Sequence, residues 1–88
     1  MLTGAQIRAG RALLGWSGVN LAKRAGVSYP TVQRAETADG VPRMKAPNLF
    51  AIQRALEEGG VVFLDPGENR DGGPGVRLTP RRPDPGTQ

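Results

Sequence analysis

Three helix starts follow one another within the first 30 residues, and their spacing limits this part of the chain to short helices joined by tight turns. A hydroxyl residue stands at each start, where it can accept a hydrogen bond from the first helical turn: Thr3, Ser17 and Ser28. Gly15 and Gly26 stand where the first two helices should end, because glycine readily adopts the left-handed conformation that closes a helix. The spacing therefore predicts a helical unit.

Capping and apolar spacing predict four helices in the first two thirds of the chain. Thr3 and Gln6 match a capping box, and the helix that they begin should run to about Leu14. Pro47 opens the fourth helix, because proline is well tolerated in a first helical turn. The predicted helices cover residues 4–14, 18–25, 29–36 and 47–58.

Two short strands are predicted next, in a segment rich in glycine and proline. The apolar runs 61–64 and 75–78 indicate the strands, and residues 65–74 are too many for a tight hairpin turn. The fold class expected is mainly α, with four helices followed by a two-stranded β-hairpin. The organisation expected is a helical domain over residues 1–58, a hairpin over 59–79 and a disordered, proline-rich tail over 80–88.

Two residue types are missing from the composition, and their absence excludes several kinds of chemistry. The chain has no Cys and no His, so it lacks the usual ligands of zinc, iron–sulfur clusters and haem. It also lacks the residues of Cys–His and Ser–His–Asp catalysis and of disulfides. The Asp and Glu residues are scattered, and the run Gly72–Gly75 has no lysine of a phosphate-binding loop. We expect no metal, no cofactor and no enzymatic activity.

The hydropathy pattern gives an expectation about location. No apolar run approaches the roughly 20 residues that a membrane span needs, and the N-terminus has no apolar core of a signal peptide. These features predict a cytoplasmic protein without a membrane partner.

The charge is distributed unevenly along the chain. The net charge is +4, and the first 35 residues hold five basic residues and no acidic one. Residues 1–58 carry 8 basic and 4 acidic side chains, whereas residues 59–88 carry 4 of each. The whole net charge therefore belongs to the helical part. A basic surface of this kind suits an acidic partner, although a merely solvated face gives the same pattern.

The segment 16–36 carries the most informative pattern. An alanine, a glycine and a valine stand at the fifth, ninth and fifteenth places counted from Gly18: Ala22, Gly26 and Val32. This arrangement resembles the lambda-repressor-like helix-turn-helix family, also called the Xre or Cro type, and the resemblance extends over about residues 2–58. A helical hairpin without DNA contacts is the alternative that the same pattern allows.

The resemblance implies that the helix over residues 29–36 enters the major groove of double-stranded DNA. The residues that it assigns to base reading are Ser28, Tyr29, Pro30, Thr31, Gln33 and Arg34. Phosphate contacts are assigned to Gly18, Lys23, Arg24, Arg43 and Lys45. It also implies a structural ion pair between Arg11 in the first helix and Glu36 at the end of the third.

Two positions depart from the family pattern. The family usually has glutamine at the first position of the second helix, where its side chain holds a phosphate, and this chain has Gly18. Asn20 stands where an acidic residue is common. The backbone N–H of Gly18 is still available there, but the side-chain clamp is absent.

Members of this class usually bind two half-sites as dimers, so the resemblance implies a homodimer on a pseudo-palindromic operator. The predicted dimer element is the apolar part of the hairpin: Val61, Val62, Phe63, Leu64, Val76 and Leu78. Two alternatives remain for this hairpin. It could only cap the core of a monomer, or it could form a wing that touches DNA through Arg70 or Arg77.

The function expected is a sequence-specific transcriptional regulator, acting as a repressor or autoregulator. The alternative is an antitoxin or other protein-interaction module of the same fold, which would bind a protein partner through its C-terminal segment. Sequence-independent DNA binding is a further alternative.

Overall fold

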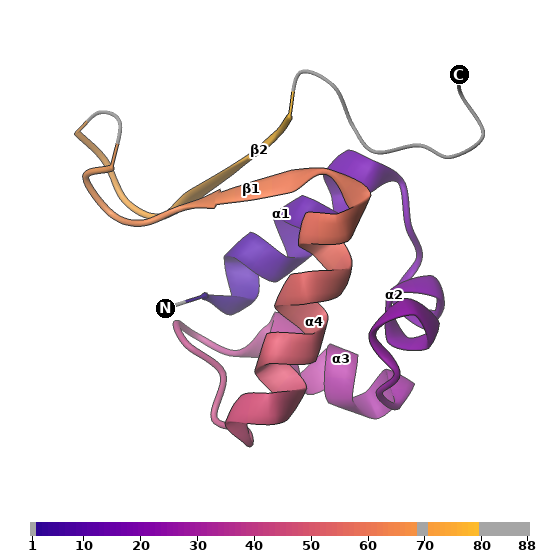
Figure 1. The fold of residues 1–88 in the computed structure, drawn as a ribbon. Helices are drawn as coiled ribbons and strands as arrows, with labels where there is room; N and C mark the ends of the chain where they lie inside the picture. The colour runs from indigo at the N-terminus through magenta and orange to yellow at the C-terminus, as the bar shows by residue number, and fades with distance from the viewer. Residues whose placement is uncertain (1, 69–70, 80–88) are drawn as a thin grey trace, which may run out of the picture.

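The chain folds into four helices followed by a two-stranded antiparallel hairpin, as a computed structural model shows (Figure 1). The structure describes residues 2–68 and 71–79, so the predicted tail over residues 80–88 and Arg70 lie outside the described residues. The elements are α1 (Gly4–Leu14), α2 (Gly18–Ala25), α3 (Tyr29–Thr37), α4 (Ala46–Gly59), β1 (Val61–Leu64) and β2 (Gly75–Leu78). The mainly α fold class with a terminal hairpin is confirmed. Within the described residues, no helix is long and apolar enough to cross a membrane.

The predicted helix starts are confirmed in detail. The hydroxyls of Thr3, Ser17 and Ser28 each accept a hydrogen bond from the backbone N–H three residues ahead. In α1 the capping box closes, because the N–H of Thr3 donates to Oε1 of Gln6 at 2.9 Å. The boundaries differ from the expectation by one residue in three places, since α3 continues to Thr37 and α4 begins at Ala46 and ends at Gly59.

The predicted helix ends also occur where glycine allows them. Gly15 and Gly26 adopt φ values of 70° and 73°, and both donate backbone hydrogen bonds to the last turns of α1 and α2. These left-handed closures let the next helix begin after only three residues. The three short helices are therefore held close together around one core.

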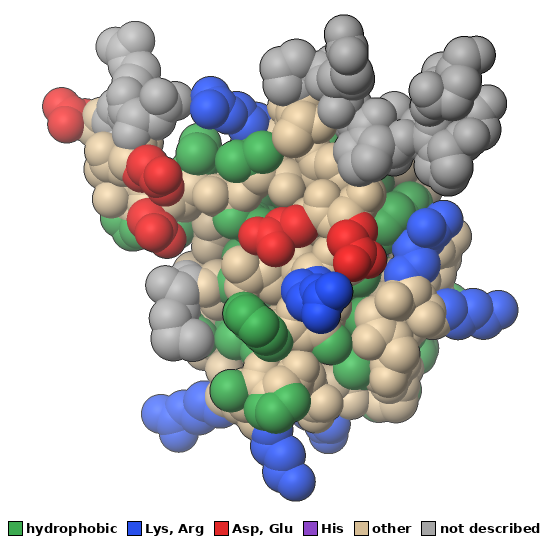
Figure 2. Space-filling view, viewed as in Figure 1, with side chains coloured by type: hydrophobic (Ala, Val, Ile, Leu, Met, Phe, Trp, Pro, Cys, Tyr) green, Lys and Arg blue, Asp and Glu red, His purple; other side chains and the backbone are tan. Residues whose placement is uncertain are grey.

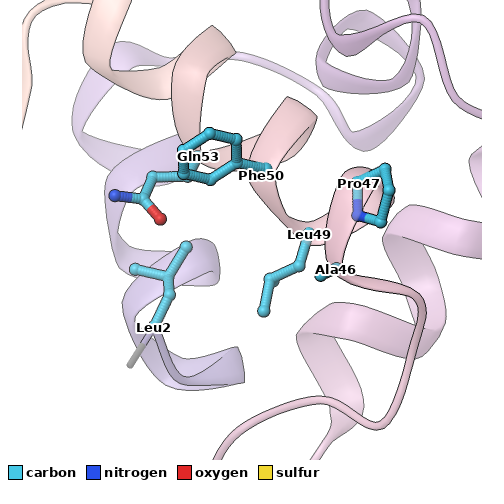
Figure 3. A pocket seen from close by; sticks show the side chains of 6 residues that line it. All are labelled: Leu2, Ala46, Pro47, Leu49, Phe50 and Gln53. Atoms are coloured by element: carbon cyan, nitrogen blue, oxygen red, sulfur yellow. The ribbon is translucent and has the colours of Figure 1, made fainter.

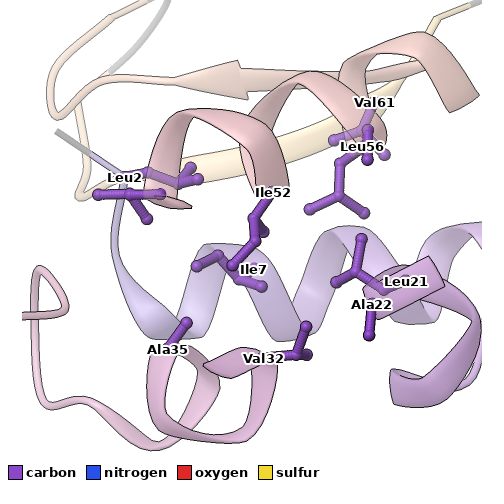
Figure 4. Packing of buried hydrophobic residues seen from close by; sticks show 11 residues of the cluster. Leu2, Ile7, Leu21, Ala22, Val32, Ala35, Ile52, Leu56 and Val61 are labelled. Carbon is purple, nitrogen blue, oxygen red and sulfur yellow. The ribbon is translucent and has the colours of Figure 1, made fainter. Parts of the chain in front are cut away.

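The core lies where all four helices meet (Figure 4). One apolar stripe from each helix points inward, and the largest side chains with under 2% exposure are Ile7, Leu21, Val32, Ile52 and Leu56. Val61 at the start of β1 joins this core with 2% exposure. Burial on this scale supplies most of the stability of so small a domain.

The hairpin lies across α1, on the side away from α3 (Figure 1). Its strands pair with Val61 opposite Leu78 and Phe63 opposite Val76. Directly opposed residues share a face of the sheet, and these four side chains all pack on the helical core. The remaining residues of the two strands belong to the outward face: Val62, Leu64, Gly75 and Arg77.

This arrangement divides the predicted dimer element between two faces. Val61, Phe63, Val76 and Leu78 pack on the helices of their own chain, and Val61 is fully buried there. Only Val62 and Leu64 of the predicted set belong to the outward face. Every residue of β1 is apolar although only alternate residues face the helices, so the outward side of this strand is apolar as well.

One buried amide fastens the hairpin to α1. The side chain of Gln6 is 5% exposed, and its Nε2 donates to the carbonyl oxygens of Leu64 at 3.1 Å and Gly75 at 2.9 Å. The same side chain accepts the capping hydrogen bond from Thr3. Gln6 thus joins the start of the first helix to the far end of the hairpin.

Gln6→Ala is expected to lower the free energy of unfolding by about 1–3 kcal/mol, because it leaves two hairpin carbonyls and the helix cap without their partner. Urea unfolding followed by circular dichroism measures the change. Gln53→Ala is the matched control, since Gln53 bonds only to the exposed Glu57 in the next helical turn. Equal stability of the two variants would show that the amide does not hold the hairpin.

Candidate nucleic-acid interface

The helices α2 and α3 follow one another across a short turn, and the surface between them is built from small and branched residues. Ala22 of α2 and Ala35 of α3 are buried, and Leu21 and Val32 fill the space beside them. The turn between the helices is short because Gly26 closes α2 and the N–H of Val27 donates to the carbonyl of Ala22 at 3.1 Å. The helix α3 is consequently fixed along one side and open along the other.

The open side of α3 carries most of the residues predicted to read bases. Tyr29, Pro30, Gln33 and Arg34 are exposed, and Ser28 is exposed just before the helix. The only acidic residue of α3, which the structure describes in full, is Glu36, and its side chain is buried on the other side. The exposed face of α3 therefore combines polar, aromatic and basic groups without a negative charge.

Thr31 departs from this set. It is only 8% exposed, and its hydroxyl lies 2.8 Å from that of Ser28, within the cap of α3. The hydroxyl pair satisfies the start of the helix internally, so Thr31 lies apart from the exposed residues that were predicted with it. The sequence could not show this, because the same hydroxyl spacing fits both a cap and an exposed pair.

The residues predicted to contact phosphates fall into two groups. Lys23, Arg43 and Lys45 are exposed, and the structure gives their side chains no hydrogen bond to any described residue. Arg24 is exposed as well, but its guanidinium lies 4.2 Å from the centre of the Trp16 ring, and its Nε donates to Asn20 at 2.6 Å. Contacts of this kind hold a side chain in place. Arg24 is thus held by Trp16 and Asn20, whereas the other three side chains extend without such contacts.

The charges separate on the face seen in Figure 2. Acidic side chains lie over the hairpin and the adjoining half of α4, while Lys and Arg side chains project from the lower edge, near α3 and the start of α4, and from the right-hand edge, near α2. Basic side chains also lie beside the hairpin and beside the acidic groups in the middle of this face. The edges formed by α2, α3 and the start of α4 show basic but no acidic side chains in this view.

The predicted ion pair between Arg11 and Glu36 is formed. Nε of Arg11 lies 2.6 Å from Oε2 of Glu36, and Nη2 lies 3.0 Å from Oε1. Nη1 of Arg11 also donates to the carbonyl of Trp16. The carboxylate of Glu36 raises the pKa of the Arg11 guanidinium above its ordinary value by hydrogen bonding, although partial burial acts against this. The pair ties α1, the following turn and α3 together.

Arg8 adds a contact that the sequence did not predict. Its Nη1 donates to the backbone carbonyl of Glu36, at the end of α3. Arg8 and Arg11 lie three residues apart and so share one face of α1. That spacing was the available signal that both could reach the same segment.

An apolar pocket lies between the chain start and α4 (Figure 3). It measures about 550 Å³, and Phe50 on its wall is 63% exposed. The lining residues are Leu2, Ala46, Pro47, Leu49, Phe50 and Gln53. Phe50 lies outside the buried stripe of α4, which consists of Leu49, Ile52 and Leu56, and its place off the helical spacing of these residues was the available signal.

No cluster of three or more metal-ligating side chains occurs among residues 2–68 and 71–79. In comparisons with models of known protein families and with curated protein sequences, the chain matches none.

Proposed function

We propose that this chain is a sequence-specific DNA-binding transcriptional regulator with a lambda-repressor-like helix-turn-helix fold, acting as a repressor or autoregulator. The observation that carries the proposal is the division of α3 into two sides. Glu36, its one acidic residue, is turned inward to Arg11, while Tyr29, Gln33 and Arg34 stand outward. An exposed helix face without negative charge suits the major groove, which is lined by phosphates and presents base edges.

The proposed readout assigns different chemistry to each side chain. The fork of Arg34 matches O6 and N7 of guanine, and the amide of Gln33 matches N6 and N7 of adenine. Pro30 suits the methyl group of thymine. Lys23, Arg43 and Lys45 are free to meet phosphates, and such contacts fix the position of the protein without reading sequence.

The proposed assembly is a homodimer on two half-sites, because one helix-turn-helix reads only a few base pairs. Selection of bound sequences from a random duplex pool tests function and assembly together. The expected result is an enriched pseudo-palindrome whose half-sites lie about 10 base pairs apart, or a multiple of that spacing. If no sequence is enriched while the chain still binds DNA, sequence-independent binding is the correct function.

Arg34→Ala is expected to reduce the preference for the selected operator over a duplex changed at one base pair by about 1–3 kcal/mol. Lys23→Ala is the matched comparison and should weaken operator and scrambled duplexes alike, with a salt slope shallower by about one. Fluorescence anisotropy at two salt concentrations measures both effects. An equal loss on operator and scrambled DNA in Arg34→Ala would rule out base reading by this side chain.

One observation favours the alternative function, in which the same fold serves as an antitoxin or other protein-interaction module. The pocket beside Phe50 is apolar and is not formed by α2 or α3. This alternative predicts that a purified protein partner binds the chain and that Phe50→Ser weakens the complex without changing DNA affinity. Undiminished partner binding by Phe50→Ser would remove the pocket's support for this alternative.

A further inference from the structure

Gly18 opens α2, and its missing side chain leaves room for an aromatic ring. A Cβ atom added at Gly18 would lie 2.7 Å from Cε1 of Tyr29, and 3.5 Å and 3.8 Å from two further ring atoms. The first distance is too short for real neighbours, so any other residue at position 18 would displace the ring. The ring of Tyr29 therefore lies directly against the backbone at the start of α2.

Backbone conformation does not explain the glycine. Gly18 lies within the first turn of a regular helix, and the left-handed glycines of the described chain are elsewhere, for example Gly15 and Gly26. In a helix, glycine is less favourable than alanine because it loses more conformational freedom on folding. Gly18 carries this cost although its backbone conformation does not require glycine. The close contact with the ring of Tyr29 explains why glycine stands there.

Tyr29 is the first residue of α3, at the start of the predicted reading helix. Its backbone is fixed by the Ser28 cap on one side and by the ring of Pro30 on the other. The Tyr29 side chain is 43% exposed, so Gly18 supports one part of it and leaves the rest in solvent. An aromatic side chain has only two rotatable bonds, and one supporting contact restricts them strongly.

We propose that Gly18 is a positioning residue for Tyr29, which it holds in the orientation that contacts the base pair at the start of α3. The inference rests on the proposed DNA-binding function. It assigns a role to the position at which the chain lacks the usual glutamine of the family. Direct phosphate contact by a side chain at position 18 is replaced by support of the neighbouring reading residue.

A double-mutant cycle on the full chain tests this coupling, with the selected operator and a duplex changed at the base pair nearest the start of α3. Tyr29→Ala should reduce the preference between these duplexes about fivefold or more. Gly18→Ala should cause a comparable loss with Tyr29 present and little further loss in the Tyr29→Ala background, because the two residues act as a unit. Gly10→Ala is the matched control in another helix and should leave the preference unchanged.

A second measurement separates positioning from overall stability. The clashing atom belongs to the outer end of a side chain that can swing into solvent, so Gly18→Ala should unfold at nearly the same urea concentration as the parent chain. NMR cross-relaxation between the Tyr29 ring and the α-protons of Gly18 should be strong in the parent and absent between these residues in Gly18→Ala. This readout follows the ring whether or not DNA is present.

The outcomes distinguish the inference from the function on which it rests. Additive losses in the double mutant, or an unchanged operator preference in Gly18→Ala, would overturn the positioning role and leave DNA binding intact. Absence of any preferred sequence for the parent chain would overturn the proposed function and the positioning role together. Coupled losses with the ring contact present in the parent and lost in the variant would support both.

Discussion

Glu36→Ala is expected to lower the free energy of unfolding by about 3–5 kcal/mol, because it leaves the guanidinium of Arg11 partly buried without its carboxylate. The side chains of Arg11 and Glu36 are 27% and 10% exposed, and two hydrogen bonds of 2.6 Å and 3.0 Å join them. Breaking a pair that is largely removed from water costs far more than breaking one in solvent. Urea unfolding of the parent and variant measures the difference.

The exposed pair on α4 provides the matched control. Arg54 and Glu58 lie 3.5 Å apart with 68% and 70% of their side chains exposed, so Glu58→Ala should change stability by less than about 1 kcal/mol. The double substitution Arg11→Met with Glu36→Leu should recover part of the loss, since apolar groups of similar size need no partner charge. Similar losses in Glu36→Ala and Glu58→Ala would contradict the structural role of the buried pair.

The same substitution should weaken DNA binding. Glu36 stands near the end of α3, and its carboxylate is the side-chain partner of Arg11 in α1, which also donates to the carbonyl of Trp16. Without the link, α3 can shift on its neighbours while the reading residues themselves are unchanged. Operator affinity of Glu36→Ala, measured at a temperature where the variant is still folded, tests this consequence.

Gly4→Ala is expected to destabilise the fold by about 1–3 kcal/mol or more, although alanine favours helices over glycine. A Cβ at Gly4 would lie 2.6 Å from the carbonyl oxygen of Ala35 and 2.7 Å from that of Ala38. Both atoms belong to the backbone at the end of α3, and backbone atoms cannot move aside as a flexible side chain can. The substitution should push α1 away from α3, and thermal or urea unfolding measures the result.

Gly10→Ala, in the same helix, provides the opposite expectation. Its added Cβ would meet Val61 at 3.4 Å and Phe63 at 3.6 Å, which are ordinary packing distances. This variant should be as stable as the parent or more stable by up to about 1 kcal/mol, because alanine loses less backbone freedom on folding. Stabilisation by both alanines would show that the close approach of α1 to the end of α3 is not rigid.

The helices could be predicted because their start and stop signals are local. Thr3, Ser17 and Ser28 act on the N–H groups three residues ahead, and Gly15 and Gly26 act through their own φ angles. These caps and glycines therefore act within a few residues of their own positions. The Arg11–Glu36 pair joins distant segments, and it could be predicted only from the family resemblance.

Features that depend on approach between elements could not be predicted. The stacking of Arg24 on Trp16 and the support of Tyr29 by Gly18 each depend on how close two segments come. The strand run 61–64 gave no sign of which residues face the helices, because it is apolar throughout. The register with β2 decides this, and the long connection between the strands hides that register from the sequence.

The position of the hairpin limits how two copies could share one duplex. The outward face of the hairpin and the helix α3 lie on opposite sides of α1 (Figure 1). Two copies stacked through Val62 and Leu64 would point their α3 helices in opposite directions and would bridge two separate duplexes. Pairing along a strand edge relates the copies by an axis normal to the sheet, so both α3 helices face the same way. The way in which two hairpins associate would thus decide whether a dimer binds one operator or connects two separate duplexes.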